Sequence, residues 1–103
     1  MNYVQGLDIA ELYESNGRLD KAVAKYEYMA QDSWFPSDVR LYYRLAAAYA
    51  RNNNLQGALL YLQKVARKNP EILDLVAADK SFDVLRGNEQ FAVLIQQAKR
   101  EVV

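Results

Sequence analysis

Apolar residues recur along the chain at the three- and four-residue spacing of an α-helix, and short polar breaks separate the apolar stretches. The breaks hold Gly17, three consecutive asparagines at 52–54, and Gly87, and both residue types tolerate the backbone conformation that follows a helix end. No segment alternates apolar and polar residues as a half-buried strand does. The pattern predicts helices over residues 3–16, 19–31, 38–51, 55–68, 70–78 and 89–101, with one further turn at 81–86.

The chain repeats itself after 36 residues, which indicates antiparallel helical hairpins of one design. Small residues at Ala22 and Ala58 let the two helices of a hairpin approach closely, and larger ones such as Tyr13 and Tyr49 fill the space beside them. The residues that carry the repeat are Ala10, Tyr13, Asn16, Leu19 and Ala22, which fall on Ala46, Tyr49, Asn52, Leu55 and Ala58.

The second copy of this pattern resembles the tetratricopeptide repeat, a helix–turn–helix unit of 34 residues. Its matching positions are Tyr42, Leu45, Ala46, Tyr49, Ala58 and Pro70, with Asn53, Leu62 and Val65 as substitutes at three others. The first copy matches at Ile9, Ala10, Tyr13, Gly17, Ala22 and Tyr26. It departs at three positions, where Gly6 replaces a large residue, Met29 replaces alanine and Trp34 replaces proline.

The resemblance implies an all-α fold in which antiparallel helix–turn–helix repeats stack as a short right-handed α-solenoid. We expect one domain over residues 1–103, with repeats at 3–36 and 37–70 and a degenerate capping repeat at 71–103. The third unit keeps Gly87 and Ala92 but has Asp79, Lys80 and Asp83 at core positions. Repeat arrays need their last apolar face covered, and the residues expected to do so are Phe82, Leu85, Phe91, Leu94 and Ile95.

Members of this family bind an extended peptide or a short helix in a concave groove lined by the first helix of each hairpin. The positions that correspond to the groove are Leu7, Asp8 and Glu11 in the first repeat, and Arg40, Tyr43, Arg44, Ala47 and Arg51 in the second. One wall is therefore acidic and the other basic. Residues 1–38 carry a net charge of −4, residues 39–68 a charge of +6 with no acidic side chain, and residues 69–103 a charge of −2.

Two interpretations of this charge pattern stay open. In the first, the acidic and basic walls pair with each other, in exposed ion pairs that contribute about 0–1 kcal/mol each. In the second, Arg40, Arg44 and Arg51 receive acidic side chains or the C-terminal carboxylate of a peptide, because the planar guanidinium binds carboxylate through two hydrogen bonds. The family's clamp for chaperone C-termini requires lysine and asparagine where this chain has Leu7 and Glu11, which argues against that partner.

The resemblance predicts a protein–protein interaction module, an adaptor, assembly factor or chaperone-like scaffold, that binds a peptide or helix of its partner in the groove. The alternative is a self-association module, in which the groove or an open end of the array buries a second copy. Trp34 and Phe35 add a further choice, because they either form an exposed patch in the connector or fold back over the first hairpin.

Composition excludes most other functions. The chain has neither cysteine nor histidine, which removes thiolate metal ligands, cysteine nucleophiles and the commonest general base. It also lacks the glycine-rich phosphate-binding motifs, so we expect no enzyme, cofactor or metal. A net charge of zero argues against a nucleic-acid partner. No stretch approaches the roughly 20 apolar residues of a membrane span, and without the pattern of a signal peptide the expected location is cytoplasmic.

Overall fold

The computed structural model describes residues 3–31 and 39–102 of the chain, and these residues form helices without any β-strand. The elements are α1 (Tyr3–Ser15), α2 (Leu19–Gln31), α3 (Val39–Arg51), α4 (Leu55–Lys68), the 3-10 helix η1 (Pro70–Ile72), α5 (Leu73–Ala78), the 3-10 helix η2 (Lys80–Leu85) and α6 (Glu89–Val102). The pattern-based helices are confirmed to within one residue at their ends, except that residues 70–78 divide into η1 and α5. The expectations for Trp34 and Phe35 lie outside the described residues.

The hairpin turns share one backbone geometry. In each turn, the second residue after the helix end has a positive φ, which is +74° at Gly17, +61° at Asn53 and +91° at Gly87. In the first two turns the next N–H donates back to a tyrosine carbonyl at 2.8 Å, from Arg18 to Tyr13 and from Asn54 to Tyr49. These bonds satisfy carbonyls that a helix end leaves open. The 36-residue repeat of the sequence is thus a repeat of turn geometry.

The small residues at the repeated positions lie between the helices of each hairpin, as predicted. Ala22 and Ala58 have no accessible surface, and neither do Ala10 and Ala46 on the facing helices. A methyl group in place of a longer side chain lets the helix surfaces interlock at short range. The two helices of each of these hairpins, α1–α2 and α3–α4, have the most extensive contacts among the element pairs of the described residues.

Two departures from the family pattern compensate each other in the first hairpin. Met29 of α2 is fully buried and lies over Gly6 of α1. A Cβ atom added at Gly6 would come within 2.8 Å of both Sδ and Cε of Met29. The space that the larger side chain needs in α2 is therefore provided by the missing side chain in α1.

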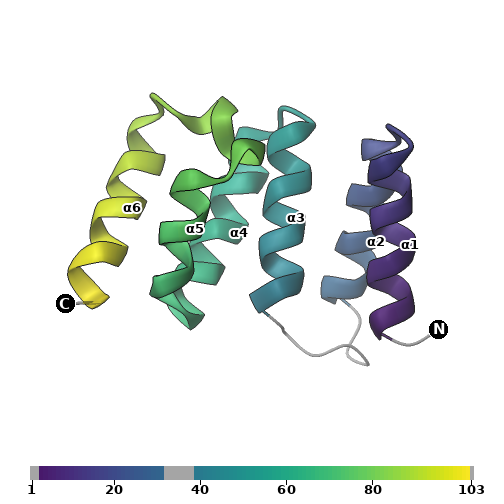
Figure 1. The fold of residues 1–103 in the computed structure, drawn as a ribbon, viewed down its shortest axis with the longest axis horizontal. Helices are drawn as coiled ribbons and strands as arrows, with labels where there is room; N and C mark the ends of the chain where they lie inside the picture. Colours follow the sequence, from purple (N-terminus) through teal and green to yellow (C-terminus); the bar gives the residue numbers. More distant parts are fainter. Residues whose placement is uncertain (1–2, 32–38, 103) are drawn as a thin grey trace.

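The hairpins follow one another along the long axis of the molecule, which measures 39 × 26 × 19 Å (Figure 1). The first core lies between the α1–α2 hairpin and α3, where Leu41, Leu45 and Ala48 are fully buried. The second core lies between the α3–α4 hairpin and the C-terminal elements. Opposite faces of α3 therefore contribute to different cores, which is the arrangement of a stacked array.

The C-terminal elements η1 to α6, which we call the cap, pack against the α3–α4 hairpin in the second core. Asp79 has an extended backbone (φ −82°, ψ 124°) and separates α5 from η2. Its carboxylate accepts the N–H of Ser81 at 2.9 Å and so begins the 3-10 turn. Of the predicted cap residues, Phe82 and Leu85 are fully buried, and Leu94 and Ile95 pack partly buried against the same core.

Candidate functional site

The predicted groove residues occupy α1 and α3, but they are not equally accessible. Leu7 and Ala47 are only 6% and 9% exposed and belong to the two cores, so a ligand would find little of them on the surface. Their small exposure follows from their positions, which face the neighbouring elements of the stack. We call the remaining residues the charged surface, and they are Asp8, Glu11, Arg40, Tyr43, Arg44 and Arg51.

Part of the charged surface is paired within the chain. Arg44 of α3 forms an ion pair with Glu11 of α1, so the acidic and basic walls do contact each other at this point. The two side chains remain 37% and 47% exposed, however, and water reaches both. Exposed pairs of this kind contribute about 0–1 kcal/mol to stability.

Two other residues of the charged surface are held by the cap, which the sequence pattern did not reveal. The hydroxyl of Tyr43 donates to the Asp79 carboxylate at 2.5 Å, and its ring packs edge-on against Phe82. Arg51 donates to the hydroxyl of Ser81 at 3.2 Å. The one available signal was Asp79 itself, because an acidic residue at a core position of the repeat indicates that its helix is interrupted there.

Electrostatics differ between the carboxylates near Arg51. Burial raises the pKa of Glu14 above its ordinary 4.5, and the charge of Arg51 offsets part of the rise. Burial and the charge of Glu14 also raise the pKa of Tyr26, whose enclosed hydroxyl makes no hydrogen bond of good geometry. Burial alone would raise the pKa of Asp79, but the hydrogen bonds from Tyr43 and Ser81 outweigh it and hold that pKa below 3.8.

Asp79→Asn is therefore expected to lower the melting temperature at neutral pH. In acid, the melting temperatures of the variant and of the unchanged protein should become equal. A carboxyl with a lowered pKa in the folded state contributes stability above about pH 4, and this contribution is lost as the pH falls through the lowered value. Thermal melts between about pH 7 and pH 2.5 measure the difference. Asp74→Asn, an exposed change on α5, is the control, and a difference that stays constant with pH would contradict the assignment.

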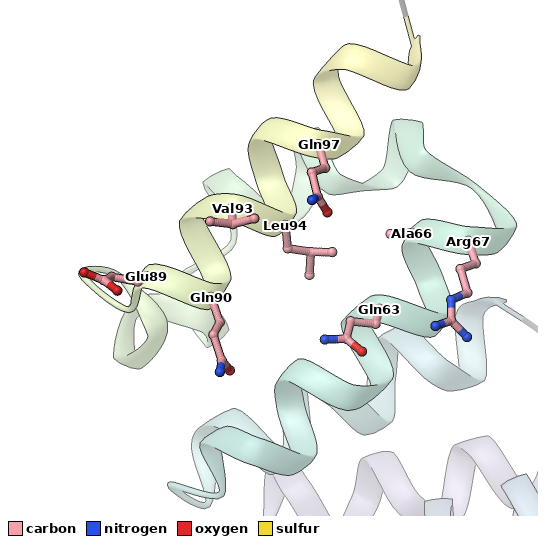
Figure 2. A pocket seen from close by; sticks show the side chains of 8 residues that line it. All are labelled: Gln63, Ala66, Arg67, Glu89, Gln90, Val93, Leu94 and Gln97. Carbon is pink, nitrogen blue, oxygen red and sulfur yellow. The ribbon is translucent and has the colours of Figure 1, made fainter.

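Two of the hollows in the described part of the chain concern binding. One of about 410 Å³ lies beside the charged surface, where Arg51, Asp79, Ser81 and Val84 line it. The other, of about 600 Å³, opens between α4 and α6 and is shown in Figure 2. We call it the α4–α6 cleft. The residues of α4 that line it are Gln63, Ala66 and Arg67, and no sequence motif indicated this cleft.

Residues 3–31 and 39–102 hold no cluster of acidic side chains that could coordinate a metal ion. Among the described helices, none combines the length and the apolar character needed to cross a bilayer. What the surface does offer is charged, aromatic and amide side chains on rigid helices, which is suited to binding.

A comparison with protein families identifies one segment of this array. The family model for the tetratricopeptide repeat matches residues 39–72, the segment that forms α3, α4 and η1. Residues 39–72 are a tetratricopeptide repeat. No curated protein and no solved structure matches it. Tetratricopeptide repeats serve in general as protein–protein interaction modules and as non-catalytic scaffolds.

Within the tetratricopeptide repeat of residues 39–72, the side chains divide by role. Leu45, Ala46 and Ala58 form the packed interior and have no accessible surface, whereas Arg40 and Arg51 are exposed along α3. The division of the remaining residues into a first repeat and a degenerate third one stays a prediction. The fold class itself, an all-α array of helical hairpins, is confirmed for the described residues.

Proposed function

We propose that the charged surface binds an acidic segment of a partner protein, in extended or short helical form, through Arg40, Arg44 and Arg51. The segment from residue 39 to residue 68 contains six basic and no acidic side chains, so α3 presents its arginines without a competing carboxylate of its own. Arginine binds carboxylates in a two-pronged geometry that lysine does not offer.

The observation that carries the proposal is the accessibility of the Arg44–Glu11 pair. Because both side chains are more than a third exposed, a ligand carboxylate can replace Glu11 on Arg44 at a cost of about 1 kcal/mol or less. Without a ligand, Glu11 occupies the position on Arg44 that a ligand carboxylate would take, and it holds the Arg44 side chain toward α1. Tyr43, the residue before Arg44 in α3, is half-buried and adds aromatic surface, which is common at the centre of protein interfaces.

The double variant Arg40→Glu with Arg44→Glu is expected to weaken binding of a fluorescein-labelled octaglutamate peptide by at least about tenfold, or 1.4 kcal/mol. Fluorescence anisotropy measures the affinity, and circular dichroism checks that the melting temperature changes little. Lys21→Glu with Lys68→Glu makes the same change in net charge at exposed sites away from this surface. Equal loss in both double variants would mean that net charge alone attracts the peptide.

Self-association is the second candidate, and the outer face of α1 favours it. Ile9 and Leu12 are 36% and 62% exposed, while Leu45 and Ala48, which stand 36 residues later, are fully buried against the first hairpin. The helix face with which α3 packs against the first hairpin is therefore exposed to solvent at the equivalent positions of α1. Light scattering over about a hundredfold range of concentration separates the candidates, because a mass that stays monomeric contradicts self-association.

A further inference from the structure

We propose that the α4–α6 cleft is a second binding site, distinct from the charged surface, for an extended acidic peptide segment of a partner protein. The cleft and the charged surface share no residue, because one lies between α4 and α6 and the other on α1 and α3. The proposal therefore does not depend on what the charged surface binds.

The cleft has two walls and an apolar floor. In Figure 2 the side chains of Gln63, Leu94 and Gln97 point into the space between the helices, whereas Glu89 points away from it. Ala66 is 9% exposed and forms part of the floor together with Leu94, while Val93 is 52% exposed at the α6 edge. An apolar side chain placed on this floor would cover surface that now faces water.

Amide side chains make the walls suited to a peptide backbone. Gln63 of one wall faces Gln90 and Gln97 of the other, and each amide offers one acceptor and an NH₂ donor group. A peptide in extended form presents the complementary N–H and C=O groups along its length. The lining residues 90–97 of α6 span about 10 Å, which is the length of about three extended residues. Every second side chain of such a segment would face the floor.

The charged residues near the cleft indicate that the bound peptide is acidic and in which direction its charge lies. The α4 wall has Arg67 and no acidic residue. Because α4 and α6 run in the same direction (Figure 1), their basic last turns lie at one end of the cleft, and Glu89 in the first turn of α6 lies at the other. The basic residues of these last turns are Arg67, Lys68, Lys99 and Arg100. Carboxylates of the occupant therefore belong at the end next to Arg67.

The open shape of the cleft favours a peptide over a small molecule. Sites for small ligands enclose roughly 70–90% of the ligand surface, whereas this cleft leaves one side open to solvent between the two helices (Figure 2). A peptide can leave one edge in water and still gain backbone hydrogen bonds and a buried side chain.

The test selects ligands without assuming their sequence. Random peptides of about twelve residues, longer than the cleft can hold, are displayed on phage and selected on the intact chain. The enriched peptides are labelled, and their affinities are measured by fluorescence anisotropy for two matched pairs of variants. The first pair is Arg67→Glu in the cleft and Lys21→Glu at an exposed position of α2 outside it. The second pair is Gln97→Ala in the cleft and Gln96→Ala outside it.

The proposal expects acidic peptides with an apolar residue. Their Kd should rise at least about tenfold in Arg67→Glu and by less than about twofold in Lys21→Glu. Gln97→Ala should weaken the binding of the same peptides more than Gln96→Ala does. Binding that ignores the cleft variants and is lost in Arg40→Glu with Arg44→Glu would overturn this proposal and leave the proposed function intact. A dimer that dissociates in Arg67→Glu would also overturn it, because a second copy would then occupy the cleft.

Discussion

A chain that ends at Asn69 is expected to remain helical but to lose its cooperative thermal transition. Residues 70–102 supply Leu73, Val76, Phe82 and Leu85, which are at most 1% exposed in the second core. Burial of each such side chain contributes roughly 1.5–3 kcal/mol. The total stability of a domain is only about 5–15 kcal/mol. Removal of these residues therefore takes away burial energy that is comparable to the whole stability of a domain.

Circular dichroism and calorimetry of residues 1–69 measure the effect. The expected result is a broad, non-cooperative melt or aggregation, because the face of α3 and α4 that the cap covers would be open to water. Phe82→Ala in the full chain is the graded control and should cost about 3–5 kcal/mol while the transition stays sharp. A sharp transition for residues 1–69 would show that two hairpins are self-sufficient.

The second large effect is expected in the contact between Gly6 and Met29. Met29→Ala leaves a cavity at a fully buried site and should cost about 2–5 kcal/mol. Gly6→Leu brings a side chain to within 2.8 Å of Met29 and should cost about 1–3 kcal/mol through overpacking. The double variant places a large residue at position 6 and a small one at position 29, as the family has them. Its loss in free energy of unfolding should be at least about 1 kcal/mol smaller than the sum of the losses in the two single variants.

Denaturant unfolding of the four proteins in this cycle gives the coupling energy. Gly6→Ala in the Met29→Ala background is the control, because it adds about 1 kcal/mol of helix propensity without filling the cavity. Strictly additive losses would mean that Gly6 and Met29 do not share one space, and that their joint departure from the family pattern has another cause.

Several features of the fold followed from local sequence. The turns at Gly17, Asn53 and Gly87 could be placed because glycine and asparagine accept the positive φ that all three adopt. The buried alanines Ala22 and Ala58 could be placed because the 36-residue repeat aligned them with each other. The turns depend on the residues at each helix end, and the positions of the alanines depend on the 36-residue period of the sequence.

The candidate sites depended on contacts between distant residues. Arg44 with Glu11 was an open alternative, and the structure shows the two walls in contact there. The hydrogen bond of Tyr43 to Asp79 was not foreseen. It depends on the interruption of the helix at Asp79, after which η2 packs against α3. Leu7 and Ala47 were expected on the groove, yet the stacking of neighbouring elements buries them.

Sequence alone thus determined the helices, their turns, the small residues inside each hairpin and the segregation of charge along the chain. Tertiary structure decided which charges meet, which groove positions are covered and where α6 stands apart from α4 to open a cleft. The reason is that helix and turn formation depend on residues a few positions apart, whereas the angle and spacing of packed helices depend on side chains that meet only in the folded state.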